Sequence, residues 1–220
     1  MLSRHIVVVE NETLLRDLLA QALEANSFRV TTAANAADAK RAWQATDPDA
    51  LVVDIELGPG PSGFDLAEMI LRQSPETGIV FLTNLPDPRF FGKDSKDLPS
   101  NVAYLRKNQL VDAIDLVGAI NAVMLDEVDG SMRHDKDPNR PFAHLSRKQI
   151  AVLHLVSLGH SNQQIAQQRG TTVRAVEGMV SRIFESLGID PSADGNARVE
   201  ATRTYLAATG QMAITTQPNA

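Results

Sequence analysis

The stretch Ala50-Leu-Val-Val-Asp-Ile-Glu-Leu-Gly-Pro-Gly-Pro-Ser-Gly63 decides the fold of this chain. An apolar run ends in Asp54, and a loop rich in Gly and Pro follows. A short apolar run without alternation is typical of a strand buried on both faces, as in a parallel sheet covered by helices. In open α/β sheets, ligands bind at the carboxyl ends of the strands. Asp54 is therefore the first candidate site residue, although most acids after a strand simply start a turn.

The segments on either side of this stretch alternate between strand and helix patterns. We expect strands over 6–9, 28–32, 51–53, 79–82 and 103–105, with helices over 12–25, 36–45, 63–73 and 108–125. Short apolar strands with helices between them indicate a parallel sheet that carries helices on both faces. The predicted fold class is α/β, with a five-stranded doubly wound parallel sheet in residues 1–126.

Two segments interrupt this alternation. Residues 85–100 contain Pro86, Pro88 and Pro99, so any helix there is predicted to be short or irregular. Residues 127–143 are polar, contain two prolines and are predicted to be a linker.

Residues 144–220 are predicted to form a small all-α domain. Two S-x-x-Q capping boxes start its first two helices, and these are Ser146 with Gln149 and Ser161 with Gln164. Gly159 and Gly170 end these helices, Thr172 caps a third, and residues 198–208 form a fourth. Two short helices joined by a tight turn with Gly describe a helix-turn-helix, in which the third helix here is the candidate reader.

The composition excludes several classes of protein. The content of 43% hydrophobic and 22% charged residues is that of an ordinary globular protein. No apolar run approaches the roughly 20 residues that cross a bilayer, and the first residues lack a signal-peptide pattern. The absence of cysteine excludes disulfides and thiolate metal sites. We expect a cytoplasmic protein with no membrane partner.

The charge is unevenly distributed along the chain. The net charge is −6, yet the acidic excess lies in residues 1–126, and residues 144–220 carry a small basic excess. This asymmetry suggests two domains with different partners. The basic excess permits nucleic-acid binding without establishing it.

The predicted sheet brings several polar residues to one edge. With a strand order of 2-1-3-4-5, the carboxyl ends of the first and third strands lie side by side. Glu10 and Asn11 end the first strand, Asp54 ends the third, Thr83 ends the fourth, and Lys107 follows the fifth. Carboxylates attract Mg²⁺, and a hydroxyl with an ammonium can hold a phosphoryl group placed on Asp54.

With these residues in place, residues 4–126 resemble a response-regulator receiver domain, which has a flavodoxin-like fold. The resemblance rests on the motifs Val-Val-Val-Glu-Asn, Val-Val-Asp-Ile-Glu-Leu…Ser-Gly, Phe-Leu-Thr-Asn and Tyr-Leu-Arg-Lys, in that order. It implies that Asp54 accepts a phosphoryl group from the phosphohistidine of a sensor histidine kinase, with Lys107 assisting. It also implies that Thr83 and Tyr104 are the switch residues. The metal ligands that it implies for Mg²⁺ are Glu10, Asn11, Asp54 and the backbone of Glu56.

Two departures from the receiver pattern bear on this chemistry. Asn11 stands where the family usually carries an Asp that binds Mg²⁺. A unit charge lost about 4 Å from an ion is worth up to ~4 kcal/mol at an effective dielectric of about 20. We therefore expect weakened Mg²⁺ binding and slower phosphorylation. The loop after Asp54 is also one residue longer than usual and contains Pro59 and Pro61.

Residues 144–210 resemble a LuxR-type DNA-binding domain, on the segments Ser-Asn-x-x-Ile-Ala and Val-Ser-Arg-Ile…Leu-Gly. The resemblance implies that the outward face of the third helix enters the major groove of DNA, and its residues are Arg174, Glu177, Gly178, Ser181 and Arg182. The two arginines suit guanine or phosphate, and the glutamate suits cytosine. Arg147 and Lys148 are expected to contact phosphates.

Together the resemblances imply a two-component response regulator, a DNA-binding transcription factor switched by phosphorylation of Asp54. Its expected partners are DNA, a sensor histidine kinase and a second copy of the chain, and no turnover of a separate substrate is expected. One alternative is a degenerate receiver that regulates DNA independently of phosphorylation, through protein or ligand contacts. A second is a four-helix protein-interaction module. A third, a phosphatase with an aspartyl nucleophile, is disfavoured because Asp54-x-Glu56 follows the third strand rather than the first.

Overall fold

The computed structural model describes residues 3–190 and 196–211, so the last part of the predicted DNA-binding domain, 212–220, lies outside the described residues. The described chain forms two compact units. Residues 3–83 and 96–136 make up the first, and residues 84–95, 137–190 and 196–211 the second. The first unit thus extends past the predicted boundary at 126. The second takes in a segment from within the predicted first domain.

The first unit is built on a five-stranded parallel sheet of order β2-β1-β3-β4-β5, as predicted. Its strands are β1 (His5–Val9), β2 (Arg29–Ala33), β3 (Ala50–Val53), β4 (Gly78–Thr83) and β5 (Val102–Arg106). All but β2 are buried along their whole length, which explains why apolar residues dominate their sequences. The doubly wound α/β fold class is confirmed.

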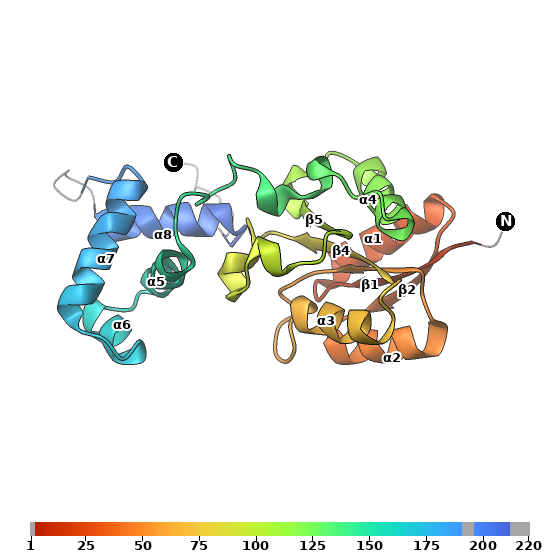
Figure 1. Ribbon diagram of the computed structural model, residues 1–220, viewed down its shortest axis with the longest axis horizontal. Helices are drawn as coiled ribbons and strands as arrows, with labels where there is room; N and C mark the ends of the chain where they lie inside the picture. Colours follow the sequence, from red (N-terminus) through yellow and green to blue (C-terminus); the bar gives the residue numbers. More distant parts are fainter. Residues whose placement is uncertain (1–2, 191–195, 212–220) are drawn as a thin grey trace, which may run out of the picture. The chain divides into compact units, whose positions relative to one another are not determined.

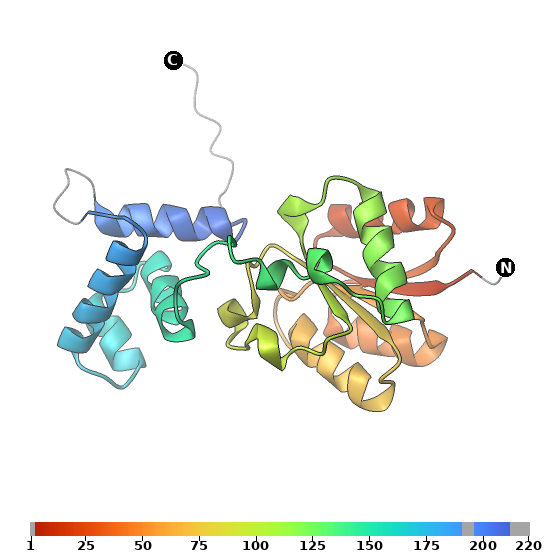
Figure 2. The ribbon, with the colours of Figure 1, turned by 45° about the horizontal axis from the view of Figure 1, so that its top comes forward.

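Helices cover both faces of this sheet. Helices α1 (Thr13–Ala25) and α4 (Ala113–Leu125) lie on one face, and α2 (Ala36–Thr46) and α3 (Gly63–Gln73) lie on the other (Figures 1 and 2). Helix α4 begins later than the predicted start at 108 because Asp112 caps it, accepting from the backbone N–H groups of Ile114 and Asp115. A short 3-10 helix, η3 (Lys107–Gln109), precedes it.

The proline-containing segment after β4 has no α-helix. It holds two short 3-10 helices, η1 (Pro88–Phe91) and η2 (Ser95–Asp97), so the prediction of a short or irregular helix is confirmed. Asp87 starts η1 by accepting the backbone N–H of Arg89, and proline at the first helical position suits this start.

Part of the predicted linker lies along the outer edge of β5. Residues 130–136 form the 3-10 helices η4 (Gly130–Met132) and η5 (His134–Lys136). Tyr104 of β5 forms a parallel bridge with Arg133, and the backbone N–H of Arg106 donates to His134 Nδ1 at 3.0 Å. These contacts protect an edge strand that would otherwise expose its backbone groups.

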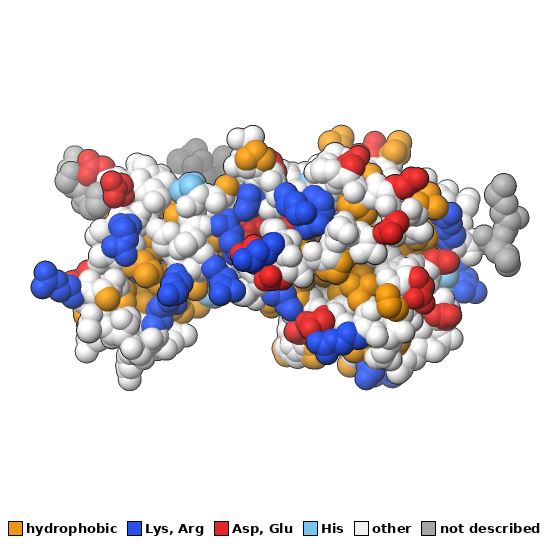
Figure 3. All heavy atoms as spheres, viewed as in Figure 1, with side chains coloured by type: hydrophobic (Ala, Val, Ile, Leu, Met, Phe, Trp, Pro, Cys, Tyr) orange, Lys and Arg blue, Asp and Glu red, His pale blue; other side chains and the backbone are white. Residues whose placement is uncertain are grey.

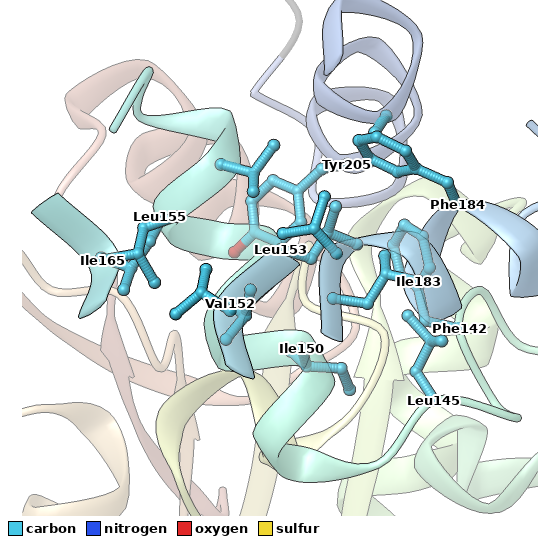
Figure 4. Close-up of a cluster of buried hydrophobic side chains, with 14 of the residues drawn as sticks. Phe142, Leu145, Ile150, Val152, Leu153, Leu155, Ile165, Ile183, Phe184 and Tyr205 are labelled. Atoms are coloured by element: carbon cyan, nitrogen blue, oxygen red, sulfur yellow. The ribbon is translucent and has the colours of Figure 1, made fainter. Parts of the chain in front are cut away.

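The second unit contains the four predicted helices, α5 (Arg147–Ser157), α6 (Asn162–Gln168), α7 (Val173–Ser186) and α8 (Ala197–Ala208). Both capping boxes are formed, and Thr172 caps α7. The core of the unit is drawn in Figure 4, where Leu153, Ile183 and Phe184 face one another and Tyr205 of α8. Among the described helices, none is both long enough and apolar enough to cross a membrane.

Candidate functional site

The register of the sheet places the first two acids next to each other. Val9 pairs with Val53, and the backbone N–H of Asp54 donates to the carbonyl oxygen of Val9 at 2.9 Å. Glu10 and Asp54 therefore leave adjacent strands at the same level. Both are buried, with Glu10 1% and Asp54 6% exposed.

Lys107 joins these two carboxylates. Its Nζ lies 2.7 Å from Glu10 Oε2 and 2.7 Å from Asp54 Oδ2. The remaining oxygens are bound by backbone groups, since Glu10 Oε1 accepts from Glu12 N–H at 3.1 Å and Asp54 Oδ1 from Glu56 N–H at 3.2 Å. The predicted meeting of Glu10, Asp54 and Lys107 is thus present in the structure.

Burial and the neighbouring charges shift the pKa values of two of these groups, Glu10 and Lys107. Burial raises the pKa of the Glu10 carboxyl, the contacts with Lys107 oppose the rise, and the charge of Asp54 adds to it. Burial alone would lower the pKa of the Lys107 ammonium, but Asp54 and Glu10 outweigh it and the pKa is raised. Lys107 is therefore a full positive charge at neutral pH, shared between two carboxylates.

The two predicted switch residues lie on the neighbouring strands β4 and β5. Thr83 ends β4, is fully buried and pairs with Arg106, the residue before Lys107. Tyr104 is also fully buried, and its ring centroid lies 6.3 Å from that of Phe81. Thr83 thus stands at the same sheet edge as the carboxylates, with Tyr104 packed in the sheet beside β4.

The long loop after Asp54 is fixed at its far end by Gly63. A Cβ atom at Gly63 would lie 2.1 Å from the carbonyl oxygen of Asp54, so only glycine fits there. Gly63 N–H also donates to Ile55 O at 3.0 Å, and Ser62 and Asp65 form a capping box that starts α3. The Ser-Gly pair of the receiver-like motif includes Gly63, and the structure gives the steric reason for glycine at this position.

The residues of this cluster fit a divalent cation. Two carboxylates with one ammonium leave an excess negative charge, and Mg²⁺ binds through one or two carboxylates together with phosphate oxygens and water. Asn11 is exposed beside them and supplies an amide rather than an acid. Accordingly, no group of three or more acidic or histidine side chains suited to a metal occurs within residues 3–190 and 196–211.

The predicted reading face of α7 points outward. Four of its residues, Arg174, Glu177, Ser181 and Arg182, are exposed, and Gly178 is half-buried. The opposite face supplies the core residues Val176, Val180, Ile183 and Phe184. A Cβ atom at Gly178 would meet nothing closer than Arg182 Nη1 at 3.7 Å, so packing does not require glycine there.

The predicted phosphate contacts differ in their availability. Lys148 is exposed, whereas Arg147 Nη1 donates to the carbonyl oxygen of Gly92 at 3.0 Å. Arg169, in the turn between α6 and α7, is exposed and was missed by sequence reasoning. Arg169 and Lys148 together line a cavity of about 640 Å³ along α5 and a second of about 190 Å³ beside α7.

Neither Lys148 nor Arg169 has a side-chain hydrogen bond or ion pair within the described part of the chain. Figure 3 shows further Lys and Arg side chains on the visible face of the second unit, between areas of apolar and uncharged atoms. Unpaired cations beside an outward helix face suit phosphate contacts.

The chain is similar to known proteins over parts of both units. Residues 6–93 match the family model of the response regulator receiver domain. The chain is 25% identical over 173 residues to the oxygen regulatory protein NreC of Staphylococcus carnosus (strain TM300), covering 73% of this chain and 79% of that protein. NreC of Staphylococcus aureus (strain MRSA252) is 27% identical over the same shares.

A solved structure of two RcsB dimers bound to two parallel DNAs also matches this chain. The TM-score is 0.56 at 16% identity, and the match covers 92% of this chain and 98% of that chain. At this identity the likeness concerns the fold, and it extends over both units.

Proposed function

We propose, from the premise that this chain is a response regulator, that it is a DNA-binding transcription factor switched by transfer of a phosphoryl group to Asp54. The observation that carries the proposal is the buried cluster in which Lys107 lies 2.7 Å from both Glu10 and Asp54. The cluster sits at the carboxyl edge of the sheet, where doubly wound folds bind ligands.

In the proposed transfer, an oxygen of Asp54 forms a bond to phosphorus as the phosphorus–nitrogen bond of a kinase phosphohistidine breaks. The electron pair of that bond stays on the histidine nitrogen. Lys107, already in contact with Asp54 Oδ2, neutralises charge on the phosphoryl oxygens. The hydroxyl of Thr83, at the end of the adjacent strand, is the proposed donor to a phosphoryl oxygen.

Mg²⁺ is proposed as the cofactor, and it would supply further positive charge to the phosphoryl oxygens. The residues that would hold it are Glu10, Asn11, Asp54 and the backbone carbonyl of Glu56. With an amide at position 11, we expect the ion to bind weakly.

DNA binding is assigned to the outward face of α7. Arg174, Glu177 and Arg182 present charged groups that recognise base edges or phosphates. Lys148 and Arg169 would neutralise phosphates beside them. Loss of one phosphate contact lowers affinity on all sequences and reduces the salt dependence of binding by about one unit.

A homodimer is proposed through the outer surfaces of α1 and α4, which lie side by side (Figures 1 and 2). Leu14 is 74% and Leu18 53% exposed on α1, and Ile114 is 71% exposed on α4. Exposed apolar side chains on adjacent helices are typical of a protein-interaction surface. A two-fold dimer would place two α7 helices on a two-fold DNA site. Sedimentation of Leu18→Glu tests this surface, with Leu158→Glu, at an exposed leucine of the second unit, as the control.

Incubation with acetyl phosphate and Mg²⁺, followed by measurement of the intact mass, tests the phosphoryl transfer. We expect one phosphoryl adduct on the native chain and none on Asp54→Asn. An adduct that survives Asp54→Asn would contradict the assignment of the acceptor.

Asn11 favours one second candidate, the same DNA-binding regulator working without phosphorylation. No adduct at saturating Mg²⁺, together with selection of a specific duplex from random DNA, would establish that alternative. For the selected duplex, Arg182→Ala is expected to weaken binding. Arg203→Ala removes the same charge from exposed α8 and serves as its control.

A further inference from the structure

Residues 84–95 follow the proposed switch residue Thr83 directly, yet they belong to the helical unit. In the sequence they lie between β4 and β5, inside the region that forms the sheet. Three sets of contacts, all within the second unit, hold them against parts of residues 137–190 and 196–211.

The first set surrounds Asp87, whose side chain is fully buried. Arg89 donates to both of its oxygens, at 2.8 Å from Nε to Oδ1 and 2.6 Å from Nη2 to Oδ2. Arg140, more than fifty positions later, donates from Nε to Oδ2 at 2.8 Å. One buried carboxylate therefore fixes two distant parts of the chain to each other.

The second set joins Arg89 and Phe90 to the start of the helical unit. Arg89 Nη2 donates to the carbonyl oxygen of Phe142 at 3.1 Å, and Nη1 donates to that of Leu145. The ring centroid of Phe90 lies 5.9 Å from that of Phe142 and 5.8 Å from that of Tyr205. Phe90 thus packs against the core that supports α5 and α8.

The third set involves the first residue after Thr83. A Cβ atom at Gly210, just after α8, would lie 2.8 Å from Asn84 Cγ, so the side chain of Asn84 rests directly on the end of α8. The hydroxyl oxygen of Tyr205 in α8 in turn lies 2.9 Å from Nδ1 of His154 in α5. A continuous series of contacts runs from Asn84 to the first helix of the helix-turn-helix.

We propose that residues 84–95 are a structural part of the DNA-binding unit and transmit the state of Asp54 to it along the chain. A displacement of Thr83 would reach Asn84 through one peptide bond and act on α8 and α5 within a single molecule. The transmission rests on the proposed function, whereas the structural role does not.

The structural role is tested by hydrogen exchange of the full chain. Phe90→Ala is expected to raise exchange in α5 and α8 while leaving the sheet of the first unit unchanged. Phe91→Ala removes the same ring from the next position, which is 41% exposed, and is the matched control. Increased exchange confined to β4 and β5, or equal effects of the two variants on α5 and α8, would overturn the proposal.

The transmission is tested by the affinity for a selected duplex with and without acetyl phosphate. Gly210→Ala places a methyl group against Asn84, whereas Gly159→Ala has nothing within 4 Å, and both glycines have positive φ angles, of 70° and 81°. We expect a response of about 5–150-fold in the native chain. It should fall towards onefold in Gly210→Ala alone, with the same adduct by mass.

An unchanged response in Gly210→Ala, or an equal loss in Gly159→Ala, would overturn the transmission. Absence of an adduct on the native chain would instead refute the phosphoryl transfer itself. In that case the exchange experiment still decides whether residues 84–95 belong to the DNA-binding unit.

Discussion

The buried carboxylates at the sheet edge of the first unit and the buried Asp87 of the second unit differ in the balance of charge around them. In the first unit, Glu10 and Asp54 share the single ammonium of Lys107. In the second, Asp87 alone receives the guanidinium groups of Arg89 and Arg140. The first cluster is short of positive charge and the second has an excess. Burial of an acid therefore does not by itself mark a ligand site, because the number of cations around the acid decides what it can still bind.

The direction of the pKa shifts follows the same division. Burial raises the pKa of Glu10, and Lys107 does not overcome it. Burial also acts to raise the pKa of Asp87, but hydrogen bonds from Arg89 and then Arg140 outweigh it and hold that pKa below its ordinary value. The first cluster therefore favours an added cation, and the second is complete within the chain.

The largest expected effect is on stability, and it follows from breaking the second cluster, of Asp87 with Arg89 and Arg140. Asp87→Asn removes the charge that compensates two guanidinium groups and should lower the free energy of unfolding by about 3–5 kcal/mol, as for other broken buried pairs. Urea unfolding followed by circular dichroism measures the loss. Glu200→Gln, exposed on α8, is the control and should change stability by less than about 0.5 kcal/mol. A loss as small as that of the control would show that Asp87 is not structural.

In the first cluster, of Glu10, Asp54 and Lys107, which is poor in cations, a substitution is expected to change the rate of phosphorylation. Lys107→Met removes the ammonium that faces the transferring group and is expected to slow phosphorylation from acetyl phosphate by about 100-fold. The rate of adduct formation by mass measures the effect, with Lys40→Met on the exposed surface of α2 as the control. An unaltered rate in Lys107→Met would remove Lys107 from the mechanism.

The contributions of the two clusters to stability should depend on pH in opposite directions. Because the folded-state pKa of Asp87 is lowered, its contribution to stability is present above the unfolded value of about 3.9 and is lost as the pH falls through the folded value. The stability difference between the native chain and Asp87→Asn should therefore shrink below about pH 4. Glu10 has a raised pKa, so its ionisation costs stability as the pH rises, and Glu10→Gln should gain relative stability at neutral pH. Unfolding curves at a series of pH values measure both trends; a pH-independent difference for Asp87→Asn contradicts the first.

The smallest effect concerns Asn11. Asn11→Asp adds a third acid to the cation-poor cluster and is expected to tighten Mg²⁺ binding by about tenfold, well within the ~4 kcal/mol available to a unit charge at about 4 Å. The rise in unfolding temperature on adding Mg²⁺ measures it, because a ligand of the native state stabilises that state. Equal rises for the native chain and the variant would show that position 11 does not face the ion.

The sequence predicted the first cluster much better than the second. Apolar residues dominate four of the strands, so the ends of these strands could be located. The parallel register of the predicted sheet then brought Glu10, Asp54 and Lys107 to one edge. Asp87 and Arg140 meet through a tertiary contact between two irregular segments, which leaves no periodicity in the sequence. The prolines of residues 85–100 correctly indicated the absence of a regular helix, but they gave no sign of which unit the segment packs against.

In the second unit, helix caps and the apolar face of α7 were predictable because both are local patterns. The roles of the α7 side chains towards DNA stay predictions, as do the domain boundaries at 126 and 143. Arg169 was missed because a basic residue in a turn has no distinctive spacing, and only its position beside Lys148 marks it.

The assignment of residues 84–95 to the second unit has a consequence for protein engineering. A simple chimera of two such regulators would join the first half of one to the second half of the other at a single junction. In this chain a cut after any residue from 126 to 139 would separate Arg140, Phe142 and Tyr205 from their partners Asp87, Arg89 and Phe90. A working chimera would have to carry both pieces of the second unit.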